Sequence, residues 1–293
     1  MKRAVHYFLF QLFTLVALAS CNNNSSYFSA VAKNDIPLKK PQKGDWLFNH
    51  QERIQTLSDY HNSQPLTPNK ILKTIYLKPI GEFSEPEWKQ IQLTREYLEE
   101  FFQLNTVVLP KVNNNIVPAH ARRISQQHEQ LLATYIRDTV VALGKPKDAI
   151  AVLGITEMDL FPNDKWNFVF GLASYDKELA VNSIYRFHKR PLTGKQFNLS
   201  LERLLKTASH EIGHMFGLTH CVEANCLMNG TNSLAETDRS MARLCSKCQQ
   251  KLNSNLKYDN RKRLKGLAAF FNKNKLVREL QQISADLKTT ELQ

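Results

Sequence analysis

Hydrophobic and polar positions between residues 70 and 190 alternate in patterns typical of strands and helices in turn. Apolar runs predict strands over residues 73–81, 106–112 and 149–161, and two more around a polar turn within residues 167–187. Apolar positions at helical spacing predict helices over residues 84–105, with Ser84 as N-cap, and over residues 122–144, ending at Gly144. This order predicts an α+β fold, close to α/β, in which helices pack on a twisted mixed sheet.

A further helix is predicted over residues 198–217, where leucines recur at helical spacing. Asn198 or Ser200 can cap it. Gly217 ends it, because only glycine enters the left-handed region without a penalty from a β-carbon. The last turns of this helix therefore carry the residues HEIGH, and the first of these is His210. Beyond residue 255, the chain predicts one or two amphipathic helices that pack on the domain, contact lipid or bind a partner, of which packing is the most common case.

The first residues have the pattern of an export signal. A basic start, MKR, precedes an apolar run that ends in small residues before Cys21. The residues LASC resemble the lipobox of bacterial lipoproteins, in which the cysteine carries lipid. We expect a signal peptide over residues 1–20, a lipidated Cys21, and a polar tether over residues 21–66 that holds a short helix. The protein would be exported and anchored to a bacterial membrane, on the periplasmic or the outer surface; an ordinary signal peptide and an uncleaved anchor are the alternatives.

Composition narrows the possible partners. The chain has 293 residues, of which 42% are hydrophobic, enough to bury a sizeable core in one or two domains. The net charge of +12 is compatible with nucleic acid, an anionic membrane surface or acidic substrates. The positive charge is scattered, and an exported protein meets little nucleic acid. We therefore expect no nucleic-acid partner, a charge that favours solubility or membrane proximity, and a monomer.

Three histidines are spaced as metal ligands in the segment SHEIGHMFGLTHCVEANCLMNG. His210 and His214 are four residues apart, so on a helix both imidazoles lie on one face and can bind one zinc ion. After the turn at Gly217, His220 returns as the third ligand. Glu211 points to one side and can reach a water on the open position of the metal. It would act as the general base on this zinc-bound water and later protonate the leaving amine.

A methionine and four cysteines follow these histidines. Met228, in the residues CLMNG, is typical of the methionine turn below the metal in metzincins, and its thioether would pack under the histidine rings. With Cys21 set aside, the remaining cysteines form two pairs with spacings that suit a structural zinc ion: Cys221, Cys226, Cys245 and Cys248. Because Cys221 directly follows His220, this second site would fix the backbone that presents the third histidine.

The pattern HExxHxxGxxHCxxxxCxM followed by CxxC resembles the archaemetzincin family, and every named position is filled here. The resemblance covers roughly residues 70–255. It implies a metzincin-like zincin domain, with a cleft between an upper mixed α/β half and a small C-terminal half that holds the methionine turn and the cysteines. It also implies a zinc peptidase, in some members aminopeptidase-like, with the three histidines and Glu211 in the catalytic roles and the four cysteines around a second zinc ion.

The resemblance and the residues together give the expected organisation. A catalytic domain would span residues 67–258 and a helical tail residues 259–293, with peptides or proteins as substrates. The alternative is a catalytically silent lipoprotein that binds zinc or peptides, and such a protein would not need Glu211. Because exported compartments are oxidising, a Cys245–Cys248 or Cys221–Cys226 disulfide is the alternative to the second zinc ion. The residues NFVFGLASY are expected to form an edge strand that pairs with substrate, and Tyr175 and Tyr185 are candidate oxyanion donors.

Overall fold

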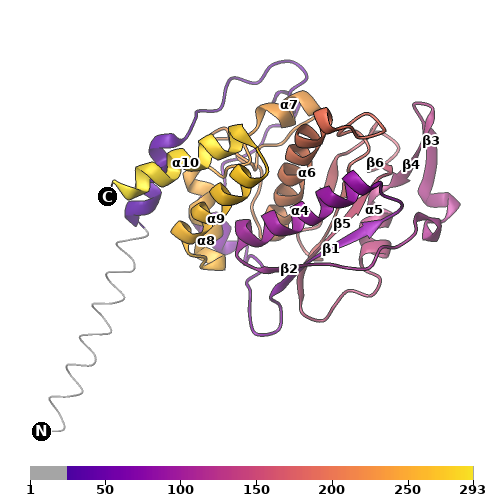
Figure 1. Ribbon diagram of the computed structural model, residues 1–293, viewed down its shortest axis with the longest axis horizontal. Coiled ribbons are helices and arrows are strands. Elements are labelled where there is room, and N and C mark those ends of the chain that lie inside the picture. Colours follow the sequence, from indigo (N-terminus) through magenta and orange to yellow (C-terminus); the bar gives the residue numbers. More distant parts are fainter. Residues whose placement is uncertain (1–24, 293) are drawn as a thin grey trace, which may run out of the picture.

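The main sheet of the protein has five strands. A computed structural model describes residues 25–292, so the predicted signal peptide and lipidated Cys21 lie outside the described residues. The strand order is β2-β1-β5-β8-β7, and Figure 1 labels β1, β2 and β5 of this sheet. Neighbouring strands are parallel except for β7, which runs antiparallel to β8 at one edge. The strands span Thr74–Ile80 (β1), Asn105–Val108 (β2), Ala149–Thr156 (β5), Gly171–Ala173 (β7) and Leu179–Ser183 (β8). The predicted mixed sheet is confirmed, and NFVFGLASY does supply an edge strand.

The helix prediction over residues 122–144 was wrong for the first half of this range, which forms two strands of a second, three-stranded sheet. Its strands are β3 (Arg122–Ser125), β4 (His128–Leu132) and β6 (Asp159–Phe161). Gln126 and Gln127 adopt positive φ angles of 52° and 66°, which make a tight turn between β3 and β4. Arg122 then pairs with Glu129 across the hairpin at 2.9 Å. Only the second half of the range is helical, as α5 (Ala133–Tyr135) and the π-helix η4 (Ile136–Val141).

Two long helices pack on each other beside the sheet. Helix α4 (Glu85–Phe102) begins as predicted: the side chain of Ser84 and the carboxylate of Glu87 form a capping box. Helix α6 (Gly194–Met215) starts four residues earlier than predicted, so Thr193 rather than Asn198 or Ser200 is its N-cap residue. Gly217 has a φ angle of +83° just beyond its end, which confirms the predicted stop. The shorter helices are α7 (Leu234–Arg239), α8 (Ser246–Leu256), η2 (Asn114–Ile116) and η3 (Ala119–Ala121).

Residues 25–66, expected to form a tether, instead pack against the domain. Residues 25–31 are helical and are followed by η1 (Ala32–Asn34), α2 (Trp46–Asn49) and α3 (Leu57–Asn62). The side chains of Val31 and Tyr60 are fully buried. We call residues 45–66 the N-terminal strap, because they lie across the loops that follow α6. The tether prediction was wrong for the described part of this segment, since isolated apolar residues in polar surroundings find their partners far along the chain.

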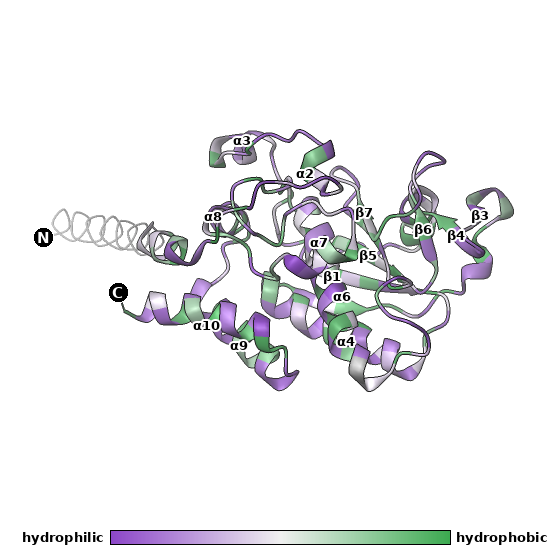
Figure 2. Cartoon of the chain, turned by 90° about the horizontal axis from the view of Figure 1, so that it is seen from above, coloured by the Kyte–Doolittle hydropathy of each residue, from purple (hydrophilic) through white to green (hydrophobic). Residues whose placement is uncertain are grey.

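The C-terminal tail also packs on the domain. This was the outcome we expected, ahead of contact with lipid or with a partner. Helix α9 (Asn260–Lys273) packs against α4, and α10 (Val277–Glu291) packs against α9, at the end of the molecule opposite the β3–β4 hairpin (Figure 1). The guanidinium of Arg263 is buried and donates to the carbonyl oxygen of Phe101 at 2.7 Å. Both helices carry hydrophilic and hydrophobic residues (Figure 2). Within residues 25–292, no helix combines the length and the apolar character needed to cross a bilayer.

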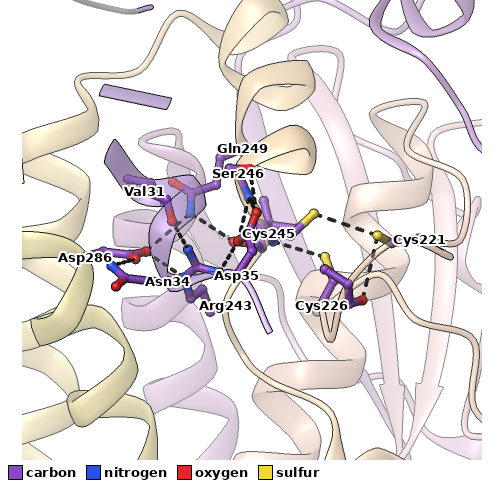
Figure 3. A network of polar contacts seen from close by, with 12 residues as sticks. Val31, Asn34, Asp35, Cys221, Cys226, Arg243, Cys245, Ser246, Gln249 and Asp286 are labelled. Carbon is purple, nitrogen blue, oxygen red and sulfur yellow. Dashed lines mark hydrogen bonds and ion pairs between the residues drawn. The ribbon is translucent and has the colours of Figure 1, made fainter. Parts of the chain in front are cut away.

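A buried ion-pair network joins both ends of the described chain to the segment that carries Cys245 (Figure 3). The guanidinium of Arg243 donates to Asp286 of α10 and to Asp35, each at 2.7 Å, and to the carbonyl oxygen of Val31 at 3.0 Å. Asp35 also accepts hydrogen bonds from the backbone and hydroxyl of Ser246. Residues 31–35 and α10 therefore hold the loop between α7 and α8 in place.

Candidate metal centres and active site

The three histidines of the motif lie together. Helix α6 presents His210 and His214 one turn apart, and the turn at Gly217 brings His220 back towards them. One ligand atom from each histidine lies within 4.8 Å of the others. Nε2 of His210 and Nε2 of His214 are 2.9 Å apart. The predicted spacing therefore does bring the three rings around one point.

The outer nitrogen of each ring faces an oxygen. Nδ1 of His210 lies 2.9 Å from the carbonyl oxygen of Leu227, and Nδ1 of His214 lies 2.6 Å from that of Leu218. Nδ1 of His220 lies 2.6 Å from Oε1 of Glu52. A ring nitrogen that faces an acceptor carries the proton, which leaves the Nε2 lone pairs free to bind a metal. Burial, and then the nearby His220, lowers the pKa of His210 to about 3, so its ring is neutral. This donor set fits zinc.

Glu211 lies between the helix and the edge strand. Its side chain is only 8% exposed, and it accepts a hydrogen bond from the backbone of Ala173 in β7. Burial raises its pKa to about 8. A β-carbon on Gly171 would lie 2.4 Å from Oε1, so this carboxylate occupies the space that a side chain at position 171 would need. The glycine in β7 is thus what lets the strand approach Glu211.

A cleft of about 550 Å³ opens onto these groups. Its walls include the three histidines, Glu211 and the whole of β7. Trp46 of the strap and Trp166 also line it, with ring centroids 6.2 Å apart. The cleft therefore lies against an edge strand and is bounded partly by the N-terminal strap.

Of the two candidate tyrosines, only Tyr175 lines this cleft. Its hydroxyl lies 2.9 Å from Nδ1 of His214. Tyr185 instead stacks on His128, with ring centroids 4.6 Å apart. The structure thus brings Tyr175 to the histidines and leaves Tyr185 in a separate contact.

Met228 lies in a tight turn directly below α6. Its carbonyl oxygen accepts a hydrogen bond from the backbone of Cys221 at 2.7 Å, and the side-chain amide of Asn229 donates to the carbonyl oxygens of Cys221 and Ala224. A β-carbon on Gly213 would lie 2.7 Å from the sulfur of Met228. The thioether thus packs against the helix at Gly213, between the two histidine positions of α6.

The four cysteines form a second cluster with all their sulfur atoms within 4.8 Å of one another. All four are buried and free of disulfide bonds. Sγ of Cys221 lies 3.7 Å from Sγ of Cys245 (Figure 3). The sulfur of Cys226 accepts hydrogen bonds from the backbones of Met228 and Cys245. Burial, and then contact with the other thiols, raises the pKa of Cys226 well above its ordinary value, so the thiol form is favoured there unless a cation is bound. Four sulfur donors with no open side fit a structural zinc ion.

A comparison with protein families identifies the chain. The model of peptidase family M54 matches residues 95–254, more than half of the sequence, including both clusters. The chain belongs to this family, the archaemetzincins. It is therefore a zinc-dependent metallopeptidase, as the resemblance implied, rather than a silent binding protein.

Known archaemetzincins resemble this chain over most of its length. Archaemetzincin-2 of Rattus norvegicus is 30% identical over 266 residues, which cover 79% of this chain and 73% of the relative. The archaemetzincin of Thermococcus kodakarensis is 33% identical over 192 residues, 63% of this chain and 98% of the relative. The crystal structure of the archaemetzincin from Methanopyrus kandleri aligns with a TM-score of 0.53 and 31% identity, over 65% of this chain and 99% of that one.

Three residues near the catalytic cluster were not found by sequence reasoning. Gly171 carried a weak signal, since an isolated glycine in a strand often marks a close backbone approach. Trp46 and Glu52 carried none, because 168 residues separate Glu52 from its partner His220. Contacts between residues so far apart in the sequence cannot be predicted from local sequence patterns.

Proposed function

We propose that His210, His214 and His220 hold a catalytic zinc ion and that Glu211 is the general base of peptide-bond hydrolysis. The observation that supports this most strongly is the set of three Nδ1–oxygen contacts, which turn every Nε2 towards one point. When bound there, zinc supplies a Lewis acid that polarises the substrate carbonyl and makes a water molecule more acidic.

The protein's own residues perform the remaining tasks. Glu211 accepts a proton from the attacking water and passes it to the nitrogen of the leaving amine. Strand β7 pairs with β8 on one side, and an extended peptide would add to its other side through backbone hydrogen bonds. Tyr175 lines the cleft, and its hydroxyl is a candidate donor to the developing oxyanion. Met228 supports α6 from below.

The four cysteines would hold a second, structural zinc ion, giving two ions per chain. Since Cys221 is bonded to His220, a metal bound there restrains the backbone that carries the third histidine of the catalytic site. A cation bound there would displace the proton of Cys226, and the backbone N–H groups of Met228 and Cys245 already donate to its sulfur.

The remaining proposals rest on the sequence. A signal peptide over residues 1–20 and a lipid on Cys21 would place a monomeric peptidase at the surface of a bacterial membrane, in the periplasm or outside. The catalytic domain would span residues 67–258. The contacts of residues 25–66 and of 259–293 with that domain argue that it functions together with both flanking segments.

Removing the carboxylate of Glu211 tests the proposed chemistry. Glu211→Gln keeps the size of the side chain and should retain both zinc ions, while cleavage of a mixed peptide library should fall by at least about 100-fold. Glu99→Gln is a matched control, since Glu99 pairs with Arg95 on the surface of α4, away from the cleft. Wild-type cleavage should also stop when a chelator removes zinc. If Glu211→Gln cleaved peptides as fast as the wild type, the assignment of the base would be wrong.

A further inference from the structure

The N-terminal strap contributes a carboxylate to the catalytic cluster. Oxygen Oε1 of Glu52 lies 2.6 Å from Nδ1 of His220. The indole of Trp46, also in the strap, donates to the same oxygen at 2.9 Å. The strap precedes residues 95–254, the part of the chain that matches the family model. This contact therefore joins a segment outside the family match to the third histidine of the motif.

Glu52 differs from the groups that face the other two histidines. His210 and His214 face neutral backbone carbonyls, whereas His220 faces a carboxylate. The other oxygen of Glu52, Oε2, is buried and has no hydrogen-bond partner among the described residues. The interaction of this carboxylate is thus directed at the imidazole of His220 and at the indole of Trp46. Among the described residues, no lysine or arginine forms an ion pair with it.

Several contacts hold the strap in the position that this interaction requires. The side chain of Gln55 donates to the carbonyl oxygen of Gly217 at 2.8 Å and accepts from the backbone of Thr219 at 3.2 Å. The hydroxyl of Tyr60 donates to the carbonyl oxygen of Phe216 at 2.8 Å. The strap is therefore bound to the same loop, residues 216–220, that carries His220.

Close packing fixes the other end of the strap. The indole ring of Trp46, at this end, lies against the methionine turn. A β-carbon on Gly230 would be 2.4 Å from its Cδ1 atom. The ring also meets His220 edge-on, with centroids 5.2 Å apart, and stacks on His50 at 3.9 Å. Glu52 is thus held between two anchored parts of the strap, so the carboxylate is positioned before any metal arrives.

We propose that Glu52 is a positioning residue of the catalytic centre, which orients His220 and strengthens its bond to the metal. This inference rests on the proposed role of the three histidines. A carboxylate hydrogen-bonded to the outer nitrogen of a metal-binding imidazole fixes the ring and raises the basicity of the ligand nitrogen. The N-terminal strap is accordingly part of the active site of this archaemetzincin.

Glu52→Gln separates charge from packing. Glutamine keeps the length of the side chain and an oxygen that can accept from Nδ1, so a purely structural role predicts an unchanged protein. We expect the affinity of the three histidines for zinc to be roughly 10- to 100-fold lower in Glu52→Gln than in the wild type. Competition with a chelator of known zinc affinity measures this difference. No variant changes the four cysteines, so zinc bound there should be the same in every sample and is subtracted as a constant background.

Two control variants isolate the carboxylate. Gln55→Ala loosens the strap without touching His220, and its effect on zinc affinity should be smaller than that of Glu52→Gln. Glu99→Gln removes a surface carboxylate from α4 and should match the wild type. Equal zinc affinity of Glu52→Gln and the wild type would overturn the inference and leave the proposed function intact. A wild-type chain that binds no zinc at the histidines would overturn both.

Discussion

A β-carbon placed on Gly171 would lie 2.4 Å from Oε1 of Glu211, so the edge strand and the proposed base share one small space. Gly171→Ala should push this carboxylate from its position. Because small misplacements of a catalytic group are costly, we expect kcat to fall by about 100-fold with zinc content unchanged. Steady-state kinetics and elemental analysis measure both quantities.

Gly194→Ala is the matched control for this change. Gly194 lies at the start of α6, and a β-carbon there would meet nothing within 4 Å. Its kinetics should equal those of the wild type. If Gly171→Ala also retained wild-type turnover, the close approach of β7 to Glu211 would have no part in catalysis.

The contact between Gly213 and Met228 predicts a loss of stability. A β-carbon at position 213 would lie 2.7 Å from the buried sulfur of Met228. Overpacking of this kind costs about 1–3 kcal/mol, and the better helix propensity of alanine offsets up to about 1 kcal/mol of it. Gly213→Ala should therefore lower the free energy of unfolding in urea. Adding Met228→Ala should remove most of the penalty of the alanine at 213, whereas strictly additive effects would show that the two residues do not interact.

Glu87 predicts a pH dependence of stability. Burial alone would raise its pKa, but hydrogen bonds with His188 and Ser84 outweigh burial and lower the pKa from 4.5 to about 2. A pKa that is depressed in the folded state stabilises the fold above pH 4.5, and this stabilisation is lost as the pH falls towards 2. The depression corresponds to about 3 kcal/mol.

Glu87→Gln should therefore lower the free energy of unfolding at pH 7 and weaken its decrease between pH 4.5 and 2. Denaturant titrations at several pH values measure this slope. Glu99→Gln, on the exposed face of the same helix, should keep the slope of the wild type. An unchanged slope in Glu87→Gln would show that this carboxylate does not contribute to acid sensitivity.

The contact between Asp286 and Arg243 predicts that the C-terminal helix stabilises the domain. Both side chains are at most 2% exposed, and they pair at 2.7 Å. Asp286→Asn keeps the shape but removes the charge, which should cost about 3 kcal/mol, since a buried guanidinium loses a partner. Thermal unfolding measures the loss. Glu291→Gln, at the exposed end of α10, should have no effect, and equal melting temperatures for both variants would contradict a stabilising role for this pair.

The sequence predicts the catalytic cluster better than it predicts the parts around it. Helical spacing and one glycine turn place His210, His214 and His220 together, because these constraints act over a few residues. The hairpin at Gln126 and Gln127 was missed, since cross-strand pairing there overrides the local pattern. The packing of residues 25–66 was missed for another reason: Glu52 and Tyr60 meet partners more than 150 residues away, and no local period records such contacts.

The most direct test of the central claim is the location of bound zinc by anomalous X-ray scattering at the zinc edge, in crystals of the purified protein. We expect one peak at the meeting point of Nε2 of His210, His214 and His220, and a second among the four cysteine sulfur atoms. Density for zinc only at the cysteines, with the three rings free of metal, would contradict a catalytic centre built on these histidines.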